Sequence, residues 1–265
     1  TLFNAITKAG AEAANFPFCT IEPNVGVVEV PDHRIYDLAA MFKPKKTTPA
    51  FTRFVDIAGL VAGASKGEGL GNQFLSHIRE TDAIAHVVRC FEDGNITHVE
   101  GSIDPVRDMD IINTELCLAD LESVDKKKTK TAKLAQAGIK QAKADLPVLE
   151  KVYDALQNGT PARALTLSDD DLEVLKELNL ITLKPVLYVL NMAEDDIADP
   201  LANEYVQAAS KEAEKEGAKW VPISAEIEEE VSELDGEEAK AFLADLGEEE
   251  PGLNRLIRTA YSMLG

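Results

Sequence analysis

The sequence predicts an α/β protein in which a mostly parallel sheet carries helices on both faces and a helical hairpin is inserted. Apolar runs of strand length alternate along the chain with segments of ten or more residues that have helical spacing. Polar residues and glycines follow the apolar runs, where the carboxyl ends of parallel strands lie. One segment between two predicted strands is much longer than a single crossover helix requires.

The strands can be placed along the chain from their apolar residues. We expect strands at residues 25–30, 50–55, 84–91, 185–191 and 219–223. The first two should be neighbours in the sheet. A glycine-rich loop at 59–71 should follow the second strand and lead into a helix at about 72–80.

The long segment between the third and fourth strands has the composition of helices. Residues 108–156 contain helix formers with apolar positions near helical spacing, and the pattern breaks around Gly138. Two long antiparallel helices that project from the sheet fit this pattern. Residues 165–183 should return the chain to the sheet.

Length and composition restrict the class of protein. With 265 residues, 45% of them hydrophobic, the chain can bury a sizeable core, and one elaborated domain is expected. No apolar run approaches the roughly 18 residues of a membrane span, and no signal peptide is indicated. Cys19, Cys90 and Cys117 lack the spacing of a zinc site or a disulfide framework. We expect a cytoplasmic protein with no membrane contact.

Charge is unevenly distributed along the chain. The net charge of −20 argues against broad affinity for nucleic acid, because phosphates would meet a repelling field. Lysines nevertheless concentrate between Lys126 and Lys143, while glutamates crowd residues 226–250. Two interpretations stay open for the lysines: a solvated helical face, or a basic prong that touches RNA or a ribosomal surface.

The tetrapeptide that ends the fourth predicted strand points to a purine site. Asn191-Met192-Ala193-Glu194 stands where guanine-nucleotide switch proteins carry Asn-Lys-x-Asp. In that tetrad the carboxylate accepts hydrogen bonds from guanine, and the lysine stem covers the base. Adenine presents the opposite donor and acceptor pattern, so methionine for lysine and glutamate for aspartate weaken the preference for guanine. We therefore predict ATP as the nucleotide.

Other loops supply the remaining parts of a nucleotide site. Asp56 follows an apolar strand and is expected to hold Mg²⁺ through water, while Gly59 approaches the γ-phosphate. Thr20 lies in an upstream loop and could ligate the metal through its hydroxyl. Ser224 and Ala225 end the last strand, where backbone N–H groups could face the purine. Each of these loops alone is weak evidence for a nucleotide site, but four of them in this order along the chain strongly indicate one.

The phosphate-binding loop that such a site needs does not occur in the sequence. No Gly-x-x-x-x-Gly-Lys-Ser/Thr string is present, yet residues 1–6 have the pattern of the helix that follows such a loop. We expect that the chain is a fragment that starts just after the loop, with Thr1 at the nucleotide, and that this fragment alone is inactive. An alternative hypothesis makes Thr1 an N-terminal nucleophile that is activated by its own amino group. This chemistry requires a threonine at the start of a strand, whereas residues 1–6 have helical spacing.

These residues resemble the Obg-like ATPase (YchF) family. The resemblance covers essentially the whole chain and is weakest between about residues 126 and 180. Its most specific strings are the following: residues 1–5 (TLFNA), 15–24 (NFPFCTIEPN), 54–61 (FVDIAGLV), 67–72 (GEGLGN), 78–83 (IRETDA), 86–91 (HVVRCF) and 250–255 (EPGLNR). The family's P-loop and its carboxyl-terminal TGS domain have no counterpart in the sequence.

The resemblance implies a P-loop NTPase fold, similar to a G domain, with a coiled-coil insertion. It implies a first part of the nucleotide-binding domain at 1–107, the insertion at 108–182 and the second part at 183–265. It also implies an Mg²⁺-dependent ATP-hydrolysing switch that associates with ribosomes, with ribosomal RNA a candidate partner for the Lys126 to Lys143 region.

The predicted site also needs a group that positions the attacking water. Leu60 stands where many GTPases keep a glutamine, and a leucine cannot hydrogen-bond water. His98, in a polar loop, could approach the γ-phosphate, and the family resemblance adds weight to this assignment. The glycines from Gly59 to Gly71 depart from a dinucleotide fingerprint and fit a switch segment instead.

Two other functions compete with the ATPase. The same fold could use GTP, since Glu194 keeps a carboxylate near the base. The chain could also be an interaction module whose helical prong binds a partner while the nucleotide site is vestigial. The sequence leaves the oligomeric state open.

Overall fold

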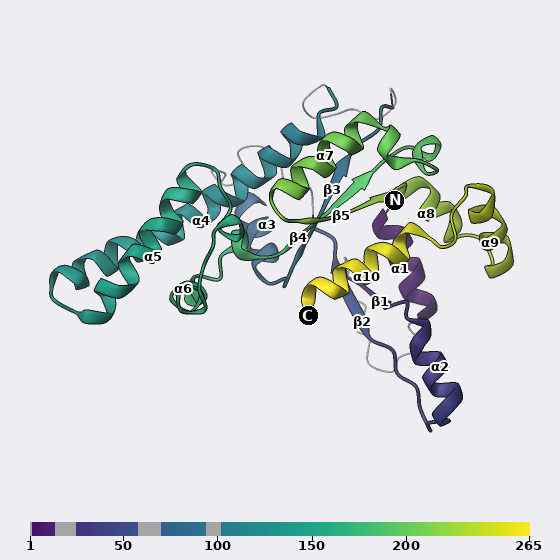
Figure 1. Ribbon diagram of the computed structural model, residues 1–265, viewed down its shortest axis with the longest axis horizontal. Helices are drawn as coiled ribbons and strands as arrows, with labels where there is room; N and C mark the ends of the chain where they lie inside the picture. The colour runs from purple at the N-terminus through teal and green to yellow at the C-terminus, as the bar shows by residue number, and fades with distance from the viewer. Residues whose placement is uncertain (1, 14–24, 58–69, 94–101) are drawn as a thin grey trace. The chain divides into compact units, whose positions relative to one another are not determined.

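The computed structural model describes residues 2–13, 25–57, 70–93 and 102–265 (Figure 1). Contacts between Cα atoms divide the chain into two compact units. The first unit contains Thr1–Asp56, Ala85–Pro105 and Leu187–Gly265, and the second contains Ile57–Ile84 and Val106–Val186.

Two sheets carry the strands. β1 (Val25–Glu29) and β2 (Phe51–Val55) pair antiparallel, with Val27 opposite Arg53. β3 (Ile84–Arg89), β4 (Val186–Asn191) and β5 (Lys219–Ile223) form a second sheet in that order. β4 and β5 are parallel. The N–H groups of Ile84 and Cys90 donate to Pro185 and Asn191, so β3 runs parallel to β4 as well. All five predicted strands are confirmed.

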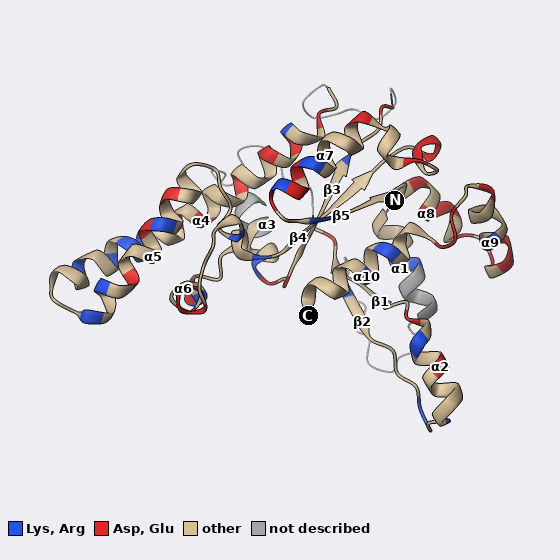
Figure 2. Ribbon diagram, viewed as in Figure 1, with Lys and Arg blue, Asp and Glu red and all other residues tan. Residues whose placement is uncertain are grey.

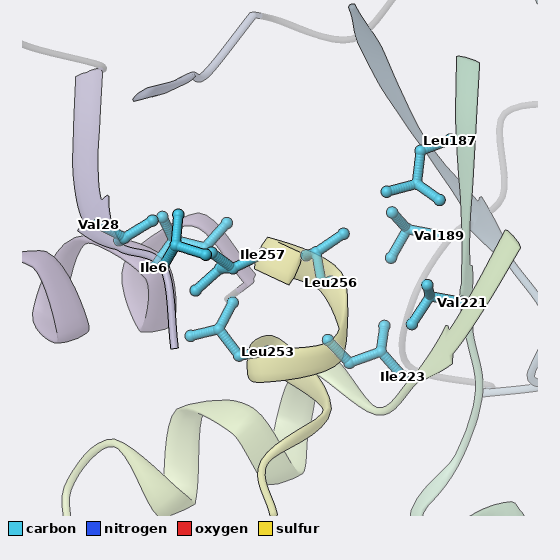
Figure 3. Close-up of a cluster of buried hydrophobic side chains, with 10 residues drawn as sticks. Ile6, Val28, Leu187, Val189, Val221, Ile223, Leu253, Leu256 and Ile257 are labelled. Carbon is cyan, nitrogen blue, oxygen red and sulfur yellow. The ribbon is translucent and has the colours of Figure 1, made fainter. Parts of the chain in front are cut away.

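The core of the first unit lies between β4, β5 and helix α10 (Gly252–Leu264). β4 is buried on both faces and is a continuous apolar run, as a central parallel strand requires. Figure 3 shows Leu187, Val189, Val221 and Ile223 on the side of Leu256, while Leu253 and Ile257 lie toward Ile6 and Val28. The cluster joins residues from the amino-terminal and carboxyl-terminal parts of the chain.

The other helices of the first unit are α1 (Leu2–Ala13), α2 (His33–Phe42), α7 (Glu204–Lys215), α8 (Ala225–Val231) and α9 (Gly236–Asp245). Side-chain caps open three of them, because a helix leaves its first N–H groups without partners. These caps are Asp32 on α2, Asn203 on α7 and Asp235 on α9.

A carboxylate from another element caps helix α10. Its N-cap, Pro251, has no side-chain acceptor. Glu228 of α8 instead accepts the N–H groups of Gly252, at 2.7 Å, and Leu253, at 3.1 Å. Glu228 is 5% exposed, and burial raises the pKa of its carboxyl group, although the two N–H groups act in the opposite direction. The carboxylate therefore fixes the start of α10 against α8.

The second unit is helical. It contains α3 (Leu70–Arg79), α5 (Lys140–Gln157), α6 (Asp169–Leu175) and all but the first residue of α4 (Pro105–Gln136). α4 and α5 form the hairpin expected from the sequence, with Gly138 in the connection. Apolar side chains join them, among them Cys117 and Val124 of α4 and Leu149 and Val152 of α5. The coiled-coil character of the hairpin and the three predicted domain bounds remain predictions. Residues 57–84, which we assigned to the first part of the nucleotide-binding domain, share a compact unit with the hairpin.

The segment that follows the hairpin is attached to it through hydrogen bonds to a buried carboxylate. Asp120 of α4 has no exposed surface and accepts hydrogen bonds from the N–H of Ile181 and from the N–H and hydroxyl of Thr182. Its other partner is Arg79 of α3, with 3.0 Å between nitrogen and oxygen. A buried carboxylate is tolerated when it is paired and hydrogen-bonded in this way. Three segments of the second unit are thereby fixed to one side chain.

None of the helices in the described ranges combines the length and the apolarity that a membrane span requires.

Candidate nucleotide site

The carboxyl ends of β4 and β5 bring two of the predicted loops together. Asn191 lies opposite Ile223 in the parallel register, and the Met192 N–H donates to the Ile223 carbonyl at 2.9 Å. The Asn191 side-chain oxygen then accepts the N–H of Ala225 at 2.9 Å. The tetrapeptide after β4 and the Ser-Ala turn after β5 are thus joined directly. Because Ala225 already donates its N–H to Asn191, that group is not available to a purine edge.

A buried hydroxyl group lies in the same turn. Ser224 is 3% exposed, and within the described part of the chain its hydroxyl has no hydrogen-bond partner. An unsatisfied buried polar group costs about 1–3 kcal/mol, so such a group indicates a site for a ligand or an ordered water. Ser224 is therefore a polar group that a bound nucleotide could satisfy.

The two residues that replace lysine and aspartate in the tetrapeptide differ in exposure. Met192 is 3% exposed, whereas Glu194 is exposed at the start of the short 3-10 helix Glu194–Asp196. A base could reach the Glu194 carboxylate from solvent. Contact between a base and Met192 requires access to a side chain that is almost fully covered, and this contact remains a prediction.

Asn203, a residue that the sequence analysis missed, holds the loop after β4. Its amide nitrogen donates to the Cys90 carbonyl at 3.0 Å and to the Asp196 carboxylate at 2.7 Å. Its oxygen caps α7 by accepting the N–H groups of Tyr205 and Val206. An asparagine just before a helical segment is a capping pattern that could have identified it. Asn203 positions the site and need not touch the nucleotide.

The remaining predicted residues divide between the described and the undescribed parts of the chain. Asp56 directly follows β2 in the first unit, and its carboxylate is exposed. No group of three or more metal-ligating His, Cys, Asp or Glu side chains occurs among the residues that the structure describes. Five predicted site residues lie outside the described residues: Thr1, Thr20, Gly59, Leu60 and His98.

The matches to known proteins assign the fold that contains these parallel strands and joined loops to the P-loop nucleoside triphosphatases of the GTPase type. Residues 1–116 match the family described as 50S ribosome-binding GTPase. A solved structure, that of the YchF GTPase of Schizosaccharomyces pombe, superimposes with a TM-score of 0.85 at 39% sequence identity. The match covers 99% of this chain and 71% of that one.

Curated relatives specify the family within this class. The ribosome-binding ATPase YchF of Bacillus subtilis is 52% identical over 265 residues, and that of Haemophilus influenzae is 55% identical over 264 residues. Each match covers all of this chain and 72% of the relative. The chain belongs to the YchF family.

Proposed function

We propose that this chain forms the nucleotide-dependent switch of an Mg²⁺-dependent ATPase that binds ribosomes. The observation that carries the nucleotide assignment is the joined pair of loops after β4 and β5. Asn191, the residue that this tetrapeptide shares with guanine-nucleotide switch proteins, bridges the loops through Ala225. Met192 and Glu194 replace the two residues that recognise guanine. The YchF relatives are named ribosome-binding ATPases, which supports the same assignment.

The metal and the reaction are assigned from the sequence pattern. Asp56, exposed at the end of β2, would hold Mg²⁺ together with Thr20, and carboxylate and hydroxyl oxygens suit this ion. The ion would neutralise charge on the β and γ phosphates. Gly59 would contact the γ-phosphate, and His98 would act near the water that Leu60 cannot orient.

A comparison of ATP and GTP binding by the full-length protein tests the nucleotide assignment. We expect ATP to bind at least tenfold more tightly than GTP in titration calorimetry with Mg²⁺, a difference of about 1.4 kcal/mol. Glu194→Asp shortens the side chain to that of the guanine-specific tetrad and should narrow this ratio. Glu194 is exposed, so the change should leave the stability of the fold unaltered.

Glu237→Asp is the matched control, because Glu237 lies on α9 with an exposed side chain. This variant should keep the ATP to GTP ratio of the native protein. Tighter binding of GTP than of ATP by the native protein would overturn the proposal.

GTP is the second candidate substrate. The exposed Glu194 carboxylate is a hydrogen-bond acceptor that guanine could use, and the S. pombe relative is described as a GTPase. The titration decides between the two nucleotides. The interaction-module alternative predicts that partner binding survives Asp56→Asn without any dependence on nucleotide.

Three further assignments belong to the proposal. The protein would act in the cytoplasm, where its ribosomal partner is found. The chain would divide at 107 and 182 into two parts of a nucleotide-binding domain and an inserted hairpin. The lysine-rich segment from Lys126 to Lys143 would face ribosomal RNA or another ribosomal surface.

A further inference from the structure

The start of helix α7 is hydrogen-bonded to two segments that each follow a strand of the second sheet. One is the short helix Glu194–Asp196 in the loop after β4, and the other is the segment 90–93 after β3. All of these parts belong to the first compact unit. The side chains of Asn203 and Tyr205 make the contacts, and we call this pair the α7 junction.

The Asn203 side chain uses all of its hydrogen-bonding groups. Its amide nitrogen donates to the Cys90 carbonyl and to the Asp196 carboxylate, and its oxygen accepts two N–H groups of α7. An asparagine amide has two donor hydrogens and an oxygen with two lone pairs, so each of these groups has a partner here. Rotation of the side chain would break bonds to three separate segments at once. One fully bonded group therefore fixes both segments to the helix.

Cys90 connects the two segments a second time, through its backbone. Its N–H donates to the Asn191 carbonyl at 2.7 Å, and its carbonyl accepts from Asn203 at 3.0 Å. Cys90 has no exposed surface, so water cannot replace either bond. Asn191 is the first residue of the tetrapeptide that ends in Glu194. A displacement of this tetrapeptide therefore acts on Cys90 directly and also through Asn203.

The short helix after β4 depends on the junction for its shape. Glu194–Asp196 consists of three acidic residues in succession, which form a red band near the end of β4 in Figure 2. Like charges so close together repel one another, so the turn needs hydrogen-bond donors that hold it. The Asn203 amide supplies one to Asp196 at 2.7 Å. The position of Glu194, two residues earlier, therefore depends on Asn203.

The segment after β3 is held by Tyr205 and Arg89. The Tyr205 hydroxyl donates to the Glu92 carboxylate at 2.5 Å, and this hydrogen bond raises the pKa of Tyr205. Arg89 donates to the carbonyls of Phe91, at 3.1 Å, and Asp93, at 3.3 Å. Its guanidinium also lies 4.7 Å from the centre of the Phe91 ring. The segment is therefore a defined turn that is attached to the start of α7.

We propose that Asn203 and Tyr205 are positioning residues that couple the loop after β4, where the base is recognised, to the segment after β3. Contact of a base with the loop is transmitted through this continuous set of hydrogen bonds to residues 90–93. The chain continues from there to His98, which the proposed function assigns to the attacking water. The junction thus makes hydrolysis depend on recognition of the base. This inference rests on the proposed function and specifies how two of its parts are linked.

Two variants of the full-length protein break the junction and preserve the helix. Tyr205→Phe deletes only the hydroxyl that binds Glu92. Asn203→Ser loses both amide donors but keeps an oxygen that can cap α7, since serine is a favoured N-cap residue. The controls make similar changes on other helices of the unit. Tyr36→Phe removes an exposed hydroxyl that donates to a glutamate, and Asp235→Ser replaces the N-cap residue of α9.

Hydrogen exchange with and without saturating ATP measures the coupling. In the native protein, ATP should slow exchange both in the loop after β4 and in residues 90–93. We expect Tyr205→Phe to keep the protection of the loop and to lose about half of the protection of residues 90–93. Asn203→Ser should reduce both, and the controls should match the native protein. A general loss of stability does not produce this pattern, because the readout is the difference that ATP causes.

Steady-state kinetics supply a second readout. Tyr205→Phe should lower kcat for ATP about fivefold and leave KM within about twofold of the native value, because the loop that recognises the base stays in place. Unchanged ATP protection and kcat in both junction variants, or equal losses in the controls, would overturn the inference. A native protein that does not bind ATP defeats the proposed function and this inference together. Normal ATP binding with unchanged junction variants defeats this inference alone.

Discussion

Two buried carboxylates connect residues that are far apart in the sequence. Asp120 binds Ile181 and Thr182, and Glu228 binds Gly252 and Leu253. In both cases the carboxylate accepts two consecutive N–H groups, which offset part of the cost of removing the charge from water. Asp120 also has an arginine within ion-pair distance, whereas Glu228 depends mainly on its backbone donors.

Removal of the Asp120 carboxylate should strongly destabilise the second unit. Asp120→Ala leaves Arg79 and three hydrogen-bond donors without their acceptor, so we expect a loss of about 3–5 kcal/mol in the free energy of unfolding. Urea denaturation measures this loss. Asp125→Ala is the control, because Asp125 is half exposed and only 3.6 Å from Lys128, and it should cost less than about 1 kcal/mol. Similar losses in the two variants would contradict the structural role of Asp120.

Glu228 should make stability depend on pH. Burial raises the pKa of this carboxyl above its ordinary value of 4.5, so the folded chain holds the proton more tightly than the unfolded chain. Its stabilising contribution is complete below pH 4.5 and is lost as the pH rises through the raised folded pKa. Relative to Glu228→Gln, which cannot ionise, the native chain should therefore lose stability as the pH rises above 4.5 and through the raised folded pKa.

Urea denaturation at each pH measures this difference. Glu230→Gln, which changes an exposed glutamate on the same helix, should follow the native chain throughout the series. If the free energies of unfolding of the native chain and of Glu228→Gln differed by the same amount at every pH, folding would not shift the pKa of Glu228.

Whether the role of a residue can be predicted from the sequence depends on how far along the chain its partners lie. Asn191 and Ser224 could be proposed as site residues because the tetrapeptide and the Ser-Ala turn are local patterns after apolar strands. Asp120 and Glu228 could not, because their partners lie 61 and 24 residues away and no local pattern specifies them. For Thr20, Gly59 and His98, the assignment still depends on the sequence alone.

At the scale of elements, apolar periodicity was sufficient to place the strands and the two long helices. The burial of β4 on both faces explains why its apolar run was clear. The antiparallel direction of β1 and β2 was not specified by either strand, because their alternation allows both pairings. Periodicity also gave no indication that α3 packs with the hairpin, because this packing depends on contacts of Leu75 and Ile78 with the distant Leu116.

The start of helix α10 should not accept a side chain at Gly252. A Cβ atom there would lie 2.8 Å from a Glu228 carboxylate oxygen and 3.2 Å from Ile223, so Gly252→Ala must displace the cap. We expect a loss of about 1–3 kcal/mol in urea denaturation. Gly236→Ala is the matched control at the first residue of α9, where the new atom meets open space. It should be neutral or stabilise by up to about 1 kcal/mol, and an equal loss in both variants would contradict the close approach.

At the scale of the whole molecule, the negative charge belongs mainly to the first unit. That unit has 30 acidic and 13 basic residues, a net charge of −17, whereas the second has 17 and 14, a net charge of −3. The acidic unit contains the joined loops after β4 and β5, and the nearly neutral unit contains the lysine-rich segment from Lys126 to Lys143. This division explains how a strongly acidic chain could still approach a polyanion through one part of its surface.

The full burial of Asp120 has a practical consequence for anyone who handles the protein. Dissolved ions cannot screen a carboxylate that has no contact with water, but they readily screen the exposed lysines between Lys126 and Lys143. A concentrated salt wash should therefore strip the protein from ribosomes while its helical arm stays folded, so that the eluted material can bind again after dialysis.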